Sequence, residues 1–175
     1  MNIINLENKR VVITGASKGL GSVCAKALAD CGARLVLIAR SKEKLETLRK
    51  SLKDAEKHIC IVADLTDRKQ LYECIKTAEE FLGFIDVVLH VVGGGLGLRN
   101  PLLEANDFIK LFTLNVLVAA EINRIIIPQM MKRGAGNLVH VASIASSEAT
   151  ASVGYNTVKA ALAAYVRSLG REIAG

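Results

Sequence analysis

A tyrosine and a lysine lie four positions apart near the end of the chain, at Tyr155 and Lys159. Residues at i and i+4 share one face of a helix, so a helix here would make the phenol and the ammonium neighbours. A free tyrosine has a pKa of about 10, and a nearby cation stabilises its phenolate, which lets the phenol exchange protons near neutral pH. Ser143 follows an apolar run and could hold a carbonyl oxygen beside that hydroxyl. Its alternative role is a helix cap or a loop hydroxyl.

Other polar residues lie within apolar stretches. Asn115 is flanked by Leu114 and Val116 in a long helical stretch. Because a buried amide is costly without partners, Asn115 either binds a backbone carbonyl or an ordered water in the core, or takes part in catalysis. We expect His90 and His140, each inside an apolar strand, to be core histidines. The histidines and the four cysteines have no zinc-ligand spacing, so no metal is expected.

A glycine-rich turn follows the first apolar run. Val11 to Ile13 is apolar, and the glycines after it have the spacing G-x-x-x-G-x-G, at Gly15, Gly19 and Gly21. Apolar residues then recur at helical spacing. The pattern predicts a buried strand, a turn and a helix whose first N–H groups and dipole favour a phosphate. It is neither G-x-G-x-x-G nor a P-loop. A turn that binds no ligand is the alternative.

Arg40 and Asp64 directly follow the second and third apolar runs. In a nicotinamide-binding domain the second strand ends near the adenosine ribose, where an arginine suits a 2′-phosphate and an acidic residue suits a 2′-hydroxyl. Arg40 and Lys18 therefore favour NADP(H) over NAD(H), the alternative being a solvated arginine. Asp64 could accept a hydrogen bond from the adenine amino group or cap the helix that follows.

Strands and helices alternate five times along the chain. Strands are expected at 11–15, 35–39, 59–63, 86–92 and 138–142, and helices at about 18–31, after Ser41, after a Thr66 cap, at about 104–127, and from about 152 to the end. This alternation predicts an α/β fold, a doubly wound Rossmann-type parallel sheet with helices on both faces. Ligands bind such sheets beyond the carboxyl ends of the strands, where the glycine turn, Arg40, Asp64, Gly93 and Ser143 all fall.

Length and composition bound the possibilities. The chain has 175 residues, half of them hydrophobic, which suits one compact soluble domain. The net charge of +6 comes from scattered lysines and arginines without tryptophan, so nucleic-acid binding is not expected. No uninterrupted apolar run has the ~18–20 residues of a membrane span, and residues 1–10 contain no signal-peptide core. We expect a cytoplasmic protein with reduced cysteines.

The ordered set Thr14-Gly-Ala-Ser-Lys-Gly-Leu-Gly21, Asp64, Asn115, Ser143 and Tyr155-x-x-x-Lys159 resembles the short-chain dehydrogenase/reductase family, the 3-oxoacyl-acyl-carrier-protein reductase type in particular. The resemblance implies that Tyr155 is the general acid/base. Lys159 assists it and binds the nicotinamide ribose, Ser143 orients the carbonyl, and Asn115 holds a water that links Lys159 to solvent. The implied cofactor-binding residues, besides Tyr155 and Lys159, are Gly15, Ser17, Lys18, Gly19, Leu20, Gly21, Arg40, Asp64, Leu65 and Gly93. A homodimer or homotetramer built through the two long helices is also implied.

The chain departs from the family pattern in two places. The family's Asn-Asn-Ala-Gly after the fourth strand is His90-Val-Val-Gly93 here. The family also continues beyond the catalytic helix with two strands and a substrate lid, so we expect 1–175 to be a single NADP-binding Rossmann domain, incomplete at its C-terminus and of low activity alone. The predicted function is NADP(H)-dependent interconversion of a small-molecule ketone and a secondary alcohol. The alternative is a non-catalytic nucleotide-binding or scaffolding protein.

Overall fold

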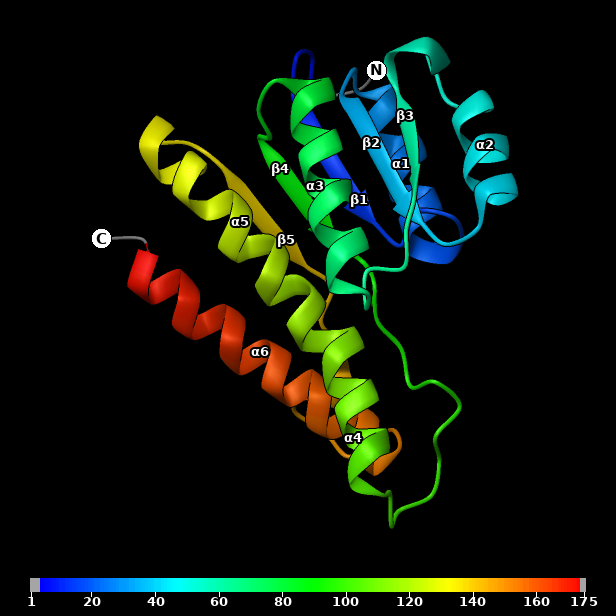
Figure 1. Cartoon of the computed structure of the whole chain (residues 1–175), viewed down its shortest axis with the longest axis vertical. Helices are drawn as coiled ribbons and strands as arrows, with labels where there is room; N and C mark the ends of the chain where they lie inside the picture. The colour runs from blue at the N-terminus through cyan, green and yellow to red at the C-terminus, as the bar shows by residue number, and fades with distance from the viewer. Residues whose placement is uncertain (1–3, 174–175) are drawn as a thin grey trace. The chain divides into compact units, whose positions relative to one another are not determined.

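The fold is a five-stranded sheet with the strand order β3-β2-β1-β4-β5, flanked by helices (Figure 1). The computed structural model describes residues 4–173. The strands are β1 (Arg10–Thr14), β2 (Arg34–Ala39), β3 (Ile59–Val62), β4 (Val87–His90) and β5 (Asn137–His140). The long helices are α1 (Gly19–Asp30), α2 (Lys42–Lys50), α3 (Arg68–Leu82), α4 (Ala105–Phe112), α5 (Val118–Arg133) and α6 (Val153–Ile173). The short ones are η1 (Ala55–Lys57), η2 (Thr113–Leu117) and η3 (Ile144–Ser146). The predicted doubly wound sheet is confirmed.

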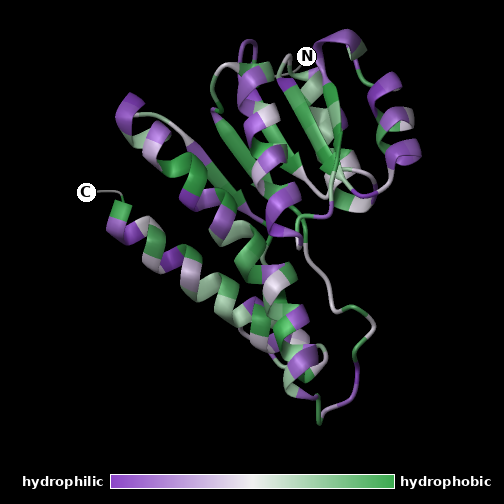
Figure 2. Ribbon diagram, in the orientation of Figure 1, coloured by the Kyte–Doolittle hydropathy of each residue, from purple (hydrophilic) through white to green (hydrophobic). Residues whose placement is uncertain are grey.

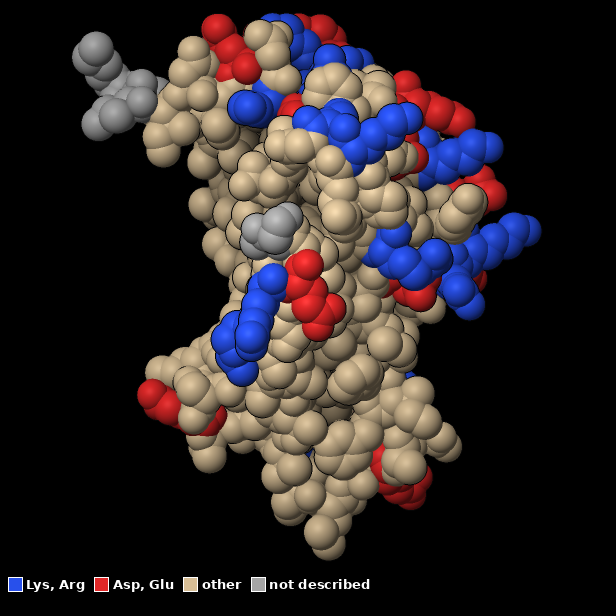
Figure 3. All heavy atoms as spheres, turned by 90° about the vertical axis from the view of Figure 1, so that its left-hand side faces the viewer, with Lys and Arg blue, Asp and Glu red and all other residues tan. Residues whose placement is uncertain are grey.

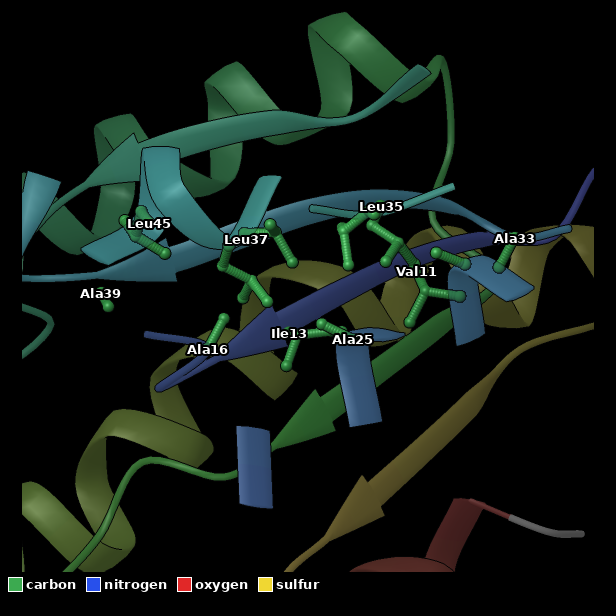
Figure 4. Close-up of a cluster of buried hydrophobic side chains, with 12 residues drawn as sticks. Val11, Ile13, Ala16, Ala25, Ala33, Leu35, Leu37, Ala39 and Leu45 are labelled. Carbon is green, nitrogen blue, oxygen red and sulfur yellow. The ribbon is translucent and has the colours of Figure 1, made fainter. Parts of the chain in front are cut away.

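The central strands β1 and β2 are largely apolar because both of their faces are covered. Side chains alternate between faces along a strand. In β1 and β2, Val11, Ile13, Leu35 and Leu37 join one cluster of buried side chains with residues of α1 and α2 (Figure 4). The intervening positions Val12, Val36 and Ile38 are equally buried, and α3 packs against β2. In Figure 2 the strands are mostly hydrophobic, whereas the helices have hydrophilic faces.

Strand pairing is parallel between β1 and β2, β1 and β4, and β2 and β3. His58, just before β3, adds a side-chain link to this ladder. Its Nδ1 accepts a hydrogen bond from the Leu35 N–H at 3.1 Å, and its Nε2 donates to the Lys53 carbonyl at 2.9 Å. Both bonds need the neutral ring with its proton on Nε2. Burial favours the same state, since it lowers the pKa of His58.

The start of α3 differs from the sequence prediction. The N-cap is Asp67, whose carboxylate accepts the N–H groups of Lys69 and Gln70, so the prediction of a Thr66 cap is wrong. Thr66 instead donates through both its N–H and its hydroxyl to Asp64, at 3.0 and 2.7 Å. A carboxylate at Asp67 can satisfy two N–H groups of the first helical turn, and this is why the helix begins one residue later.

A long apolar helical segment links α4 to α5. Between them lies η2, a π-helical turn over Thr113–Leu117 that contains the buried Asn115. By length and composition, Ala105–Arg133 is the one helical segment among residues 4–173 that could cross a membrane, with a mean hydropathy of 1.5 in its most apolar window. The sequence prediction considered only uninterrupted apolar runs and therefore did not identify this segment. Of that window 44% is buried inside the protein.

The chain divides into two compact units, which are described separately. The first comprises 1–91 and 122–139 and includes most of the sheet, and the second comprises 92–121 and 140–175. Lysines and arginines are interspersed with acidic residues on the face shown in Figure 3, so the described residues form no continuous basic surface there.

Candidate active site

The glycine turn lies in the first unit, where it joins β1 to α1. Gly15 and Gly19 have positive φ angles of 71° and 55°, which glycine adopts without strain. Gly21 packs so closely on the turn that a Cβ there would overlap the Gly15 carbonyl oxygen and lie 3.1 Å from the Ala16 Cα. The cap residue of α1 is Lys18, and it makes no side-chain capping hydrogen bond. A helix N-terminus without a side-chain cap, next to glycines that let a ligand approach the backbone, fits a pyrophosphate.

The other predicted residues of the turn are accessible. Lys18, Gly19 and Leu20 are exposed and Ser17 is half-buried, so their groups can reach a ligand at the helix start.

Arg40 and Asp64 come together at the ends of β2 and β3. The Arg40 guanidinium lies 3.8 Å from the Asp64 carboxylate, and its side chain is 77% exposed. Hydrogen bonds from Thr66 hold the pKa of Asp64 below its usual range. Asp64 therefore caps the turn before α3 while one carboxylate oxygen stays near Arg40. Leu65 is buried beside it.

Lys159 is the buried cation of the second unit. It is 4% exposed, and its ammonium donates to the Val141 carbonyl at 2.9 Å. The same nitrogen lies 5.7 Å from the centroid of the Tyr155 ring, so the predicted i, i+4 pair forms on α6. Burial lowers the pKa of Lys159, since desolvation disfavours the charged form. Val141 takes one of the three ammonium protons, so two remain for other acceptors.

Asn115 uses its side chain to fix the backbone that follows β4. Its Nδ2 donates to the carbonyls of Leu111 and Gly94, at 2.9 and 3.0 Å, and its Oδ1 accepts the Gly94 N–H at 2.9 Å. The amide side chain is therefore satisfied by backbone groups. The π-helical turn around it is a deformation that occurs often at functional sites.

Gly93 separates Asn115 from Lys159. A Cβ at this position would lie 2.8 Å from the Asn115 Oδ1 and 3.3 Å from the Lys159 Nζ. Only a residue without a side chain leaves both polar groups where they are. Gly93 is thus part of the same cluster as Asn115 and Lys159.

Ser143 begins η3, which packs against α6. Its hydroxyl oxygen accepts the Ala145 N–H at 3.2 Å, and its carbonyl accepts the Ser146 hydroxyl. The predicted capping role is therefore present. The hydroxyl proton is not used in that bond and can be donated elsewhere.

A pocket with a volume of about 650 Å³ opens in the second unit with Tyr155 in its wall. That volume lies within the range of small-molecule sites. The pocket is lined by Gly94, Gly95, Gly97, Leu98, Arg99, Thr150, Ala151, Ser152 and Tyr155. Sequence reasoning did not single out Arg99 or 150–152. The glycine run was visible in the sequence, whereas no sequence signal paired it with 150–152.

The segment 90–93, which differs from the family's Asn-Asn-Ala-Gly, makes polar contacts of its own. His90 Nε2 lies 2.9 Å from the Asn123 Oδ1 on α5, and both residues are buried. The Val91 N–H donates to the Thr14 hydroxyl at 3.1 Å. Side chains of other types therefore brace the strand where the family pattern has asparagines. His140 packs edge-on against Tyr165 on α6.

The chain is similar to known proteins over almost its whole length. Residues 9–175 match the family model for short chain dehydrogenases. The chain is 34% identical over 173 residues to the ketoacyl reductase HetN of Nostoc sp., covering 97% of this chain and 60% of that protein. It is 29% identical over 170 residues to an uncharacterised oxidoreductase of Staphylococcus aureus, covering 97% of this chain and 73% of the relative.

Two solved structures have the same fold. One is 7α-hydroxysteroid dehydrogenase in complex with NADH and 7-oxo glycochenodeoxycholic acid, with a TM-score of 0.91 and 24% identity over 97% of this chain and 67% of that one. The other is a short-chain dehydrogenase/reductase of unknown function from Caenorhabditis elegans with cofactor, with a TM-score of 0.85 and 28% identity over 97% and 66%. The chain thus spans about three fifths to three quarters of the length of these relatives.

Proposed function

Because the chain belongs to the short-chain dehydrogenase family, we propose that it is an NADP(H)-dependent reductase that interconverts a small-molecule ketone and a secondary alcohol. In this proposal Tyr155 is the general acid/base, Lys159 and Ser143 assist it, and Asn115 fixes the surrounding backbone. The observation that supports it most is the burial of Lys159 beside the Tyr155 ring. Removing an ammonium from water is energetically costly. One helical turn from a phenol, the buried ammonium can stabilise the phenolate that forms during catalysis.

Tyr155, Lys159 and Ser143 each have a part in the proposed reaction. The Tyr155 hydroxyl donates a proton to the substrate oxygen during reduction and takes it back during oxidation. The Lys159 ammonium stabilises the phenolate formed in between, and the Val141 carbonyl fixes the lysine in place. Ser143 donates a hydrogen bond from its hydroxyl to the carbonyl oxygen and so orients the substrate. When bound, the nicotinamide supplies or accepts the hydride.

The cofactor would be held by the first unit. The turn Gly15–Gly21 and the start of α1 would bind the pyrophosphate, with Ser17, Lys18 and Leu20 around it. The exposed Arg40 guanidinium would bind the 2′-phosphate of NADP(H), which supports NADP(H) over NAD(H). Asp64 and Leu65 would lie beside the adenine.

The catalytic proposal is tested with Tyr155→Phe and Lys159→Met in the full-length protein. We expect Tyr155→Phe to lower kcat by at least about 10²-fold, the usual contribution of general acid/base catalysis, while the Kd for NADPH changes little. Lys159→Met should lower kcat and move the pH dependence of kcat to higher pH. Unchanged turnover by Tyr155→Phe would refute the mechanism. Binding of NADPH by the unmodified protein without turnover of any ketone would favour a non-catalytic role.

Cofactor preference is tested with Arg40→Gln and, as a control, Lys50→Gln, an exposed cation at the end of α2. A hydrogen bond to a charged group contributes roughly 1.5–3 kcal/mol, so Arg40→Gln should lower kcat/KM for NADPH about 10- to 100-fold. Its kcat/KM for NADH should change little, and Lys50→Gln should alter neither. A higher kcat/KM with NADH in the unmodified protein would contradict the NADP(H) assignment.

We also propose that the protein forms a homodimer or homotetramer through its long helices. Ile109, Phe112 and Leu117 are 61%, 39% and 44% exposed along α4 and η2. Apolar side chains in a row on one helical segment are typical of a surface that a partner covers. Analytical ultracentrifugation of the full-length protein measures the assembly. A monomer at micromolar concentration would refute this part of the proposal.

A further inference from the structure

The pocket beside Tyr155 contains one charged residue. Among its lining residues only Arg99 carries a charge, and none is acidic. The remaining polar side chains are the hydroxyls of Thr150, Ser152 and Tyr155. The pocket therefore offers a small molecule two different polar groups, the Arg99 guanidinium and the Tyr155 phenol.

Among the residues that the structure describes, none is a partner of the Arg99 guanidinium. Within residues 4–173 no carboxylate, carbonyl or aromatic ring forms an ion pair, hydrogen bond or cation–π contact with it. Several other arginines do have partners, for example Arg49 with Glu46 and Arg133 with Asp86. A guanidinium presents five N–H donors in a planar fork that matches a carboxylate or a phosphate.

The backbone around Arg99 is fixed on both sides. The Leu98 N–H donates to the Gly95 carbonyl at 2.9 Å, and the Leu98 side chain packs on the apolar cluster of Leu111, Val116, Ala119, Val158 and Leu162. On the other side Leu103 packs on the same cluster, and the Leu102 N–H donates to the Asn100 side chain at 2.9 Å. The segment is thus anchored by side chains at both ends, so Arg99 projects from a defined position.

The facing wall, Thr150 to Ser152, is fixed by Asn156. Its Oδ1 accepts the Ala151 N–H at 3.1 Å, its Nδ2 donates to the Glu148 carbonyl at 2.7 Å, and its N–H donates to the Ser152 carbonyl at 2.9 Å. Asn156 directly follows Tyr155 on α6. The loop that forms this wall is therefore tied to the helix that positions the phenol.

From these observations, and resting on the function proposed above, we infer that the preferred substrate is a small ketone with an anionic group, whose carboxylate or phosphate is bound by Arg99 while its carbonyl faces Tyr155. Arg99 is thus a specificity-determining residue. It contributes binding energy at the end of the substrate that does not react, and such energy orients the carbonyl for the chemical step.

The test compares matched anionic and neutral ketones with the full-length protein. The pairs are 3-oxobutanoate and 4-oxopentanoate against their methyl esters, and dihydroxyacetone phosphate against dihydroxyacetone. We expect kcat/KM at least tenfold higher for the anion of one or more pairs. A preference confined to the carboxylate pairs or to the phosphate pair identifies which anion Arg99 binds.

The variants are Arg99→Gln, Arg99→Lys and, as a control, Arg167→Gln, an exposed arginine of α6 outside the pocket lining. Arg99→Gln should lower kcat/KM for the anionic ketone about 10- to 100-fold, mainly through KM, and leave the neutral ketone unchanged. Arg99→Lys should restore part of the loss, because charge remains but the fork does not. Arg167→Gln should behave as the unmodified protein.

Two failures are distinguishable. If neutral ketones are reduced as well as their anionic partners, or if Arg99→Gln weakens both members of a pair equally, this inference is wrong and the proposed reductase function stands. If no ketone is reduced and Tyr155→Phe changes nothing, the proposed function itself fails.

Discussion

Gly93 offers a direct test of the polar cluster in the second unit. Replacing it with alanine adds one methyl group 2.8 Å from the Asn115 Oδ1 and 3.3 Å from the Lys159 Nζ. Gly93 does not have a positive φ, so the substitution introduces no backbone strain of that kind. The whole effect must come from the displacement of those two groups.

The expected loss of stability in Gly93→Ala follows from the hydrogen bonds that the added methyl group would weaken. Moving the Asn115 amide away from the methyl group weakens its two hydrogen bonds with Gly94, each contributing about 1 kcal/mol. Overpacking of a filled site costs roughly 1–3 kcal/mol, which is the same range. We therefore expect Gly93→Ala to lower the free energy of unfolding by about 2 kcal/mol. A displaced Lys159 should also lower kcat by about 10²-fold, the typical effect of a 1 Å misplacement.

Urea denaturation measures the first quantity, and NADPH oxidation with a ketone substrate measures the second. Gly95→Ala is the matched stability control, because a Cβ there meets the Tyr155 side chain at 3.8 Å, an ordinary contact distance. Gly95→Ala should change the free energy of unfolding by less than about 0.5 kcal/mol. If Gly93→Ala were as stable and as active as the unmodified protein, the close cluster of Gly93, Asn115 and Lys159 would be refuted.

Three further predictions concern the first unit. Burial lowers the pKa of His58, so the unfolded chain binds its proton more readily, and the stability present above pH ~6.5 should fall as the pH drops below that value. Urea midpoints at pH 7.5 and 5.5 should therefore differ more in the unmodified protein than in His58→Gln, and equal differences would contradict this. Gly21→Ala forces a Cβ against the Gly15 carbonyl, so the Kd for NADPH should rise at least tenfold, measured by fluorescence titration, whereas Gly170→Ala, with open space around it, should leave Kd unchanged. Asp67→Ala removes the cap of α3 and should lower the urea midpoint of unfolding, and an unchanged midpoint would show that the cap is dispensable.

The sheet was predictable because its strands are buried on both faces. The run expected at 35–39 is β2 (Arg34–Ala39), whose continuous apolar sequence has no other simple explanation in a chain of this length. The start of α3 was mispredicted although a signal existed. Asp67 and Gln70 have the spacing of a capping box, and Gln70 also donates to Asp67 through its side chain at 3.2 Å.

The π-helical turn could not be predicted from sequence. It is centred on Asn115, whose partner Gly94 lies 21 residues earlier in the chain. A deformation that depends on so distant a contact leaves no local pattern. Arg99 was missed for a related reason, since an arginine in a polar loop is usually solvated, and only the wall at 150–152 gives it a pocket to face.

The arrangement around Lys159 explains why several unreactive residues matter. Desolvation disfavours the ammonium, so an unconstrained lysine side chain would turn toward water. The Val141 carbonyl binds it, the bare Gly93 leaves room for it, and Asn115 fixes the backbone beside Gly93. The cost of a buried charge is therefore offset by backbone groups and by the absence of a side chain. An alignment of reactive residues alone would not identify this support, and in the proposed mechanism its loss would lower kcat while Tyr155, Ser143 and Lys159 were all still present.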